Sequence, residues 1–256
     1  MVSLQGQVAV VTGASGIVGS GIARAFLDAG ATVIAPARSA GGKVGGQASA
    51  AGGELRPLPR QILVNLSARS AAALPPLAGA SEKMSGMAPR CTISESTPEM
   101  LMDAVTARVG PHLWATRLAT QLRPQECSSF TFITGMLGEV CPWPDAALTA
   151  VTNAAVYGAA VALQAELAGA PPRVNELRVA ALIRRDSQQE NPAFPGTPAA
   201  PASRLGALVV GLAAGKERNQ VVHVLPEQLT EGQGQGQGQG GAAGWSQEEG
   251  ALRGMS

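Results

Sequence analysis

The first 35 residues constrain the fold of this chain more than any other part. Residues 7–12 read QVAVVT, a β-branched apolar run typical of a buried strand. Residues 13–29 carry apolar side chains at helical spacing, and Gly30 is suited to end that helix. A second apolar run, ATVIA, follows at residues 31–35. A strand, a glycine-rich turn, a helix and another strand in this order predict a βαβ unit of a parallel sheet.

The rest of the chain continues the alternation. Weaker signals are a small-residue loop at 39–53 and a short helix at 67–77. We expect further strands at 61–64, 130–134, 174–183 and 220–225, and helices at 97–122, 145–167 and 204–214. This pattern predicts an α/β fold with a three-layer, doubly wound parallel sheet. We expect one domain over residues 1–228 and a disordered, Gly/Gln-rich tail over 229–256.

Composition narrows the function. A net charge of +1 over 256 residues provides no basic field for nucleic acid. Three cysteines without a CxxC spacing and two isolated histidines argue against a metal site. No apolar run approaches the length of a membrane span, and no charged segment precedes the first strand, so we expect no membrane span and no signal peptide. Free thiols indicate a reducing compartment, and we expect a cytoplasmic protein.

The turn between the first strand and the first helix, TGASGIVG at residues 12–19, is the strongest functional signal. Its helix N–H groups and the positive end of the helix dipole suit the pyrophosphate of a dinucleotide. Gly13 allows the sharp turn, Gly16 lets phosphate approach the backbone, and Gly19 lets the helix lie close to the sheet. The predicted contacts with the cofactor are Gly13, Ser15, Gly16, Ile17 and Gly19. The alternative is a glycine-rich turn that binds no ligand.

With this turn and several later motifs, residues 4–228 resemble a short-chain dehydrogenase/reductase. TGASGIVG is similar to the family's TGxxxGxG turn, although Ile17 replaces the middle glycine, and its glycine spacing is closer to the TGxxGxxG variant. The further matching segments are GATVIAPAR, VNLS, FITGMLG, NAAVYGAAVALQAELAG and RVNELRV. The resemblance implies a Rossmann fold, a nicotinamide cofactor, and dimers or tetramers formed through the helices near 97–122 and 152–167.

The resemblance also bears on the choice of cofactor. In the family, an acidic residue at the end of the second strand binds the ribose of NAD. Ala37 takes that position here and Arg38 follows it, which favours NADP over NAD because a guanidinium pairs well with phosphate. Asn65 and Leu66 stand where the family has residues beside the adenine. The alternative interpretation of Arg38 is a solvated loop charge.

The family's catalytic residues are absent from their positions. The resemblance requires a Tyr with a Lys four residues later, a Ser on the preceding strand end and an Asn on another helix. Those positions hold Thr149, Asn153, Gly135 and Ala107, respectively. We therefore predict no catalytic residue and a catalytically impaired protein or pseudoenzyme that binds NADP(H).

Two other interpretations stay open. One is a working NAD(P)-dependent oxidoreductase that acts on a small carbonyl or alcohol, with protons from water or Thr149 and with Glu139 and Asp145 as conceivable acids. The other is a non-enzymatic or poorly folded product. We expect Tyr157 to be a packing or interface residue and His112 to be a surface or partly buried residue.

One element of the family's sheet is hard to find. Its fourth strand, which lies next to the first, should fall within residues 80–96, where 90–93 is the best and still poor candidate. Either a degraded strand fills that place or the sequence lacks a segment. The proline-rich loop at 184–202, after the sixth strand, does not identify a substrate.

Overall fold

The structure is a computed structural model. It describes residues 2–35, 89–120, 122, 126–188 and 199–229 in full, and 61–66 and 230 as backbone. The expected loop at 39–53, the short helix at 67–77 and the tail from residue 231 onward lie outside these residues.

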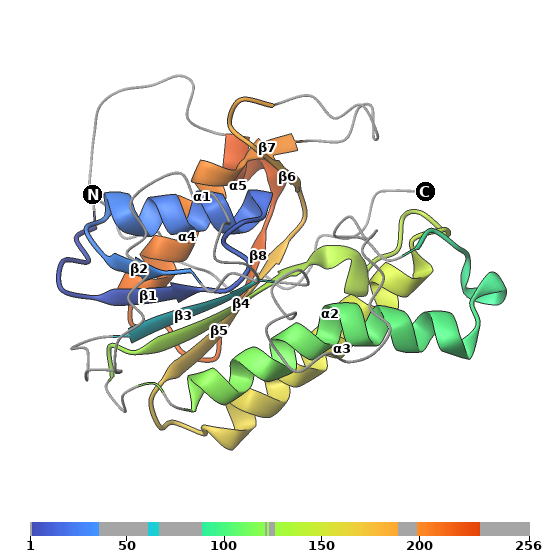
Figure 1. Cartoon of the computed structure of the whole chain (residues 1–256), viewed down its shortest axis with the longest axis horizontal. Coiled ribbons are helices and arrows are strands. Elements are labelled where there is room, and N and C mark those ends of the chain that lie inside the picture. The colour runs from blue at the N-terminus through green and yellow to red at the C-terminus, as the bar shows by residue number, and fades with distance from the viewer. Residues whose placement is uncertain are drawn as a thin grey trace.

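A six-stranded sheet forms the centre of the molecule (Figure 1). Its order is β2-β1-β3-β4-β5-β8, and every neighbouring pair is parallel. The strands are β1 Val8–Val11, β2 Thr32–Ile34, β3 Gln61–Leu66, β4 Ser129–Gly135, β5 Arg173–Val179 and β8 Val221–Val224. All strands therefore end at one edge of the sheet, where open α/β proteins bind their ligands.

Helices cover both faces of the sheet, which confirms the predicted three-layer fold. Two helices, α1 Ile17–Asp28 and α4 Ala202–Ala214, lie on one face, and α2 Pro98–Ala119 and α3 Ala147–Glu166 lie on the other (Figure 1). The chain also forms the short helices η2 Ile93–Glu95, η3 Met136–Gly138 and α5 Pro226–Thr230.

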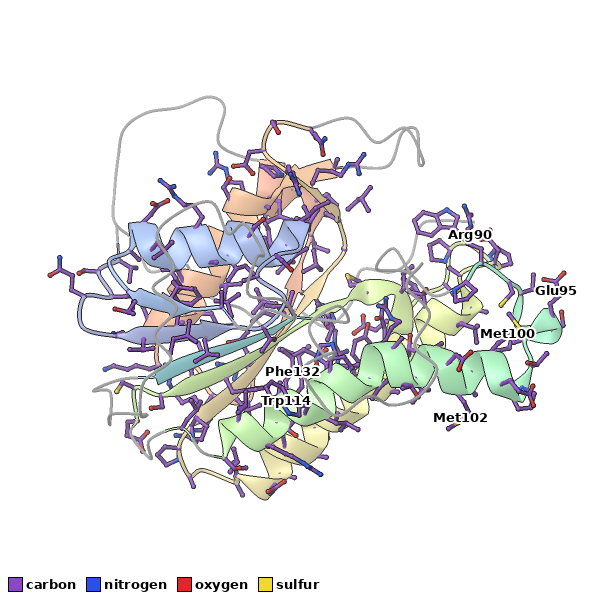
Figure 2. All side chains as sticks on the ribbon, viewed as in Figure 1. Arg90, Glu95, Met100, Met102, Trp114 and Phe132 are labelled. Carbon is purple, nitrogen blue, oxygen red and sulfur yellow. The ribbon has the colours of Figure 1, made fainter. Side chains whose placement is uncertain are left out.

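Each face of the sheet has its own apolar core. The face under α1 and α4 buries Leu4, Val11, Ile22, Phe26, Leu205 and Val209. The face under α2 and α3 buries Ala115, Phe130, Phe132, Val156, Leu163 and Val174. Figure 2 shows Trp114 of α2 near Phe132 of β4, in the layer between helix and sheet. Both cores are mainly aliphatic, with Phe26 on the first face and Phe130 and Phe132 on the second.

Helix α2 begins where the sequence predicts. The Thr97 hydroxyl accepts a hydrogen bond from the Met100 amide at 3.3 Å, and Pro98 occupies the first turn. The helix ends at Ala119, three residues before the predicted end at residue 122.

The prediction for the centre of the sheet was wrong. The predicted strand at 61–64 is present as β3, and it takes the place next to β1 that was expected for a strand within 80–96: Val64 lies opposite Val11, and Ile62 lies opposite Ser129. Residues 90–93 form no strand: Cys91 makes one isolated bridge to Ala146, and a 3₁₀ turn follows. The apolar run ILV at 62–64 suits a central position better than the polar stretch at 80–96 because a central strand is buried on both faces.

The predicted strand at 174–183 is interrupted. Strand β5 ends at Val179, and β6 Leu182–Arg184 pairs instead with β7 Ala199–Pro201 in a separate two-stranded sheet. The last bond of the main sheet in this region runs from the Ala180 amide to the Val224 carbonyl at 2.9 Å. After Ala180 the chain leaves the main sheet and runs through β6 and β7 to α4. Residues 189–198 of the proline-rich loop lie outside the described residues.

Helix α3 is long and apolar enough to cross a membrane by length and composition alone, and half of the relevant window is buried inside the protein. Its buried side chains pack against α2 and the sheet. A buried core helix meets the same criteria, and the position of α3 in the fold accounts for its composition.

Candidate functional site: a glycine turn beside a rebuilt strand end

The turn from β1 into α1 has the shape that the glycine spacing predicts. Gly13 has a φ of +73°, a conformation that side chains rarely adopt. The Gly16 amide donates to the Gly13 carbonyl at 2.9 Å, and Gly16 in turn accepts from Ser20 as the helix begins. Ser15 and Gly16 are exposed, and Ile17 is half-buried as the first helical residue.

Gly19 explains why the helix can start so close to the turn. A Cβ atom at this position would lie 2.2 Å from the Gly13 carbonyl oxygen and 2.8 Å from the Ala14 Cα. A Cβ at Gly16 would lie 3.3 Å from the same oxygen. Only glycine fits at 19, and the first-turn amides of α1, which have no intrahelical acceptor, face out of the turn. The arrangement fits a dinucleotide pyrophosphate.

The other predicted cofactor contacts are placed less completely. Arg38 and Ala37 lie outside the described residues. Asn65 and Leu66 end β3 between β1 and β4, so they lie on the opposite side of β1 from β2. Their contact with the adenine of a cofactor stays a prediction.

At the end of β4, the position of the family's Ser is filled by backbone and by other side chains. The Gly135 carbonyl accepts hydrogen bonds from Asn153 Nδ2 at 3.2 Å and from the Tyr157 hydroxyl. The Asn153 Oδ1 atom accepts from Arg108 Nη2 at 2.8 Å. Both polar atoms of Asn153 are therefore occupied within the protein. We call Gly135, Asn153, Tyr157 and Arg108 the β4-end cluster.

Arg108 is a residue that the sequence reasoning missed. Ala107 was assigned to the position of the family's Asn, but it is the next residue that reaches α3 from α2. Arg108 is buried, and burial lowers the pKa of its guanidinium. A charged residue among the apolar positions of a predicted core helix was the available signal.

The hydroxyls near the β4-end cluster are not poised for proton transfer. Thr149 is buried, and the Thr152 hydroxyl donates to the Leu148 carbonyl at 2.8 Å within α3. Tyr157 is buried, as predicted for a packing residue, with the Arg178 guanidinium 3.8 Å from its ring centre. Burial raises the pKa of Tyr157 to about 12, so its phenol keeps its proton.

A charged network follows on β5, under α3. Glu176 is fully buried and accepts two bonds from Arg178, at 2.9 and 3.0 Å, and one from the Thr134 hydroxyl at 2.7 Å. Arg178 also pairs with Glu139, which pairs with His223 at 2.9 Å. The sequence reasoning missed this network. Its signal was the spacing of Glu176 and Arg178, two charged residues two apart in the apolar strand RVNELRV, which puts both on one face.

The two acids considered from the sequence are held as carboxylates. Although burial opposes the effect, hydrogen bonds from His223 and Arg178 lower the pKa of Glu139. A hydrogen bond from Arg90, at 2.6 Å, lowers the pKa of Asp145. Neither group is therefore a ready proton donor near neutral pH.

His112 corrects another prediction. It is 2% exposed rather than at the surface, and its ring stacks on Phe132 with centroids 6.0 Å apart. Burial, together with the charge of Arg108, lowers the pKa of His112 to about 3. The position of α2 over the sheet, which local sequence does not show, brings this side chain inside.

Fold and turn together define an α/β protein of the Rossmann type. No family model matches the sequence, and no curated protein matches it either. Solved structures do match the fold.

A dehydrogenase/reductase from Sinorhizobium meliloti 1021 has a TM-score of 0.64 at 17% identity, covering 88% of this chain and 96% of that one. A candidate NAD(P)-dependent gluconate 5-dehydrogenase from Beutenbergia cavernae, with NADP bound at low occupancy, has a TM-score of 0.63 at 22% identity, covering 90% and 99%. A short-chain dehydrogenase/reductase family protein has a TM-score of 0.61 at 19% identity, covering 88% and 97%. The chain thus has the fold of short-chain dehydrogenases/reductases.

Proposed function

We propose that this protein is a short-chain dehydrogenase/reductase relative that binds NADP(H) and lacks the family's usual proton-transfer residues. The observation that carries the proposal is the turn at Gly13, Gly16 and Gly19, where a Cβ at Gly19 would collide with the Gly13 carbonyl. Such close packing of helix on turn opens the first-turn amides to a pyrophosphate. The bound NADP of the Beutenbergia protein supports this choice of ligand.

The impairment is inferred from the β4-end cluster. Thr149 and Asn153 stand at the positions of the family's Tyr and Lys. The Asn153 side chain accepts a hydrogen bond from Arg108 and donates one to the Gly135 carbonyl. Loss of proton transfer alone removes about 10²–10⁴ in rate. A cofactor-binding protein of this kind acts as a sensor, a scaffold or a partner subunit.

Titration calorimetry with NADPH and NADH tests the proposal. We expect NADPH to bind at micromolar concentration and NADH to bind more weakly. Arg38→Glu should reverse that order, because the carboxylate repels the 2′-phosphate and accepts from the ribose. Absence of heat at millimolar NADPH overturns the proposal, whereas equal binding of both cofactors overturns only the NADP preference.

We further propose that the protein is a cytoplasmic homo-oligomer that contacts its copies through α2 and α3. The support is a set of exposed apolar side chains on these helices, namely Met102, Leu113, Val151 and Val161. Isolated surface residues of this kind are common, but several on two adjacent helices suit an interface. Light scattering at the monomer mass contradicts the proposal.

A second candidate function is an NAD(P)-dependent reductase of small carbonyl compounds with a non-standard proton donor. One observation favours it: a histidine paired with a carboxylate lies at the same edge of the sheet as the glycine turn.

A further inference from the structure

We propose that His223, oriented by Glu139, transfers the proton in the reduction of a small aldehyde or ketone at the carboxyl edge of β4, β5 and β8. The inference rests on the proposed binding of NADP(H). It assigns the proton-transfer role to a different strand from the one that carries it in the resembling family.

The first step is the placement of His223. Thr134, Arg178 and His223 stand opposite one another in register on β4, β5 and β8. With strands about 4.8 Å apart, the Cα atoms of Thr134 and His223 lie about 10 Å apart. Gly135 is the next residue on β4, so a small substrate at the end of β4 is within reach of a side chain from β8.

The second step is the orientation of the ring. His223 Nε2 lies 2.9 Å from Glu139 Oε1, and the His223 side chain is 45% exposed. With Nε2 bound to the carboxylate, Nδ1 is the nitrogen available to a ligand. A carboxylate on one imidazole nitrogen fixes the ring and stabilises its protonated form, as in other histidine–carboxylate pairs.

The third step is the charge balance around the ring. The charged groups that face His223 are Glu139 after η3, and Arg178 with the buried Glu176 on β5. Two carboxylates and one guanidinium leave a single negative charge, which a proton on His223 neutralises. The neighbouring Tyr157 of α3 stays neutral because burial raises the pKa of its phenol.

The remaining described candidates are occupied or shielded. Thr152 is bonded within its helix, Asp145 is paired with Arg90, and His112 is buried against Phe132. His223 combines an exposed imidazole with a carboxylate that orients it.

The reaction balances as follows. When bound at the first turn, the reduced nicotinamide would supply a hydride, with its two electrons, to the carbonyl carbon, and the C=O π bond would break. The electron pair left on the oxygen takes the proton from protonated His223, which gives an alcohol, an oxidised nicotinamide and a neutral imidazole. Bulk water then returns a proton to the exposed ring.

A measurement independent of turnover uses the presence of only two histidines in the chain. In a proton–carbon NMR spectrum of the full protein, the two histidine signals are told apart by the one that is missing in His223→Gln. We expect NADPH at saturation to move the His223 signal. A signal that stays in place overturns the proposal.

Steady-state kinetics with NADPH and a panel of small aldehydes and ketones gives the second test. We expect His223→Gln to lower kcat at least 100-fold with calorimetric NADPH affinity unchanged. Glu139→Gln, which alters a positioning residue, should lower kcat about 10-fold and displace the pH–rate profile. Asp145→Asn is the matched control, because its carboxylate pairs with Arg90 outside this site.

The outcomes separate the two proposals. Wild-type protein that binds NADPH but reduces no member of the panel overturns the role of His223 and leaves the proposed binding function intact. Full activity in His223→Gln does the same. Failure to bind NADPH in calorimetry overturns both.

Discussion

The first turn and the β4-end cluster lie at the same edge of one sheet, yet they differ in what occupies them. At the first turn, residues 12–20 contain no titratable side chain, and the geometry depends on the absence of Cβ atoms at Gly13, Gly16 and Gly19. In the β4-end cluster, the carbonyl of Gly135 is covered by donors from Asn153 and Tyr157. The first region leaves backbone donors open for a ligand, whereas in the second the Gly135 carbonyl and the Asn153 amide are bonded to protein partners.

Under the proposed function, this difference explains how a cofactor site can persist beside altered catalytic positions. A phosphate site made of backbone amides depends on glycine spacing and is insensitive to which other side chains change. A catalytic site made of side chains disappears when two or three of them change, and buried polar groups that stay behind must find new partners. Arg108 and Asn153 are such partners, joined at 2.8 Å.

The largest effect is expected from a substitution at Gly19 in the first turn. In Gly19→Val, the new Cβ meets the Gly13 carbonyl at 2.2 Å, so the helix must move away from the turn. We expect NADPH affinity to fall at least 100-fold and the free energy of unfolding to fall by about 1–3 kcal/mol. Calorimetry and urea unfolding measure the two effects.

The matched control is Gly110→Ala in α2, where a Cβ meets nothing within 4 Å. We expect this variant to bind NADPH normally and to gain about 0.5–1 kcal/mol of stability, since alanine favours the helix. If Gly19→Val binds NADPH as tightly as this control, the first turn is not the pyrophosphate site.

A second test acts on the β4-end cluster alone. Asn153→Lys restores the cation of the resembling family but places it beside the buried guanidinium of Arg108. We expect the free energy of unfolding to fall by about 3 kcal/mol, because a buried charge loses its partner and gains a like-charged neighbour. Urea unfolding measures the loss.

Arg108→Met combined with Asn153→Lys separates repulsion from poor fit. The double variant should recover a large part of the stability, as expected for residues in direct contact. If the double variant recovers no stability, repulsion between Arg108 and the new lysine is not the cause of the loss. In both variants, NADPH affinity should change far less than in Gly19→Val.

Local patterns could be predicted from the sequence, whereas the order of the strands in the sheet could not. The β1 turn, the start of α2 at Thr97 and the alternation of strands and helices are local patterns, and the structure confirms them. The position of β3 next to β1 is a matter of sheet order, which local sequence does not encode, although its apolar run carried a hint. The resemblance placed the strand next to β1 within residues 80–96, whereas residues 61–66 take that place.

The reorganised site was harder to predict, because it depends on contacts between distant residues. The bond from Arg108 to Asn153 spans 45 residues, and the pair of Glu139 with His223 spans 84. The vacancy at the family's four catalytic positions is readable from the sequence. The residues that reorganise around it become visible only when α2, α3, β5 and β8 are packed together.

The last predicted effect is acid sensitivity, and its site is His112 on α2, the helix that also carries Arg108 of the β4-end cluster. Burial lowers the pKa of His112 to about 3 in the folded protein, against 6.5 for an ordinary histidine. Between these two pKa values the unfolded chain binds a proton at His112 and the folded protein does not. The contribution of His112 to the free energy of unfolding is therefore fully present above pH 6.5 and is lost as the pH falls toward 3. At pH 5 the loss from this residue is about 2 kcal/mol.

Urea unfolding at pH 7.5 and pH 5 should show this difference in the wild type and a clearly smaller one in His112→Phe, which keeps an aromatic ring against Phe132. An equal acid-induced loss of stability in both proteins would contradict this prediction. It would show that a group other than His112 causes the acid sensitivity.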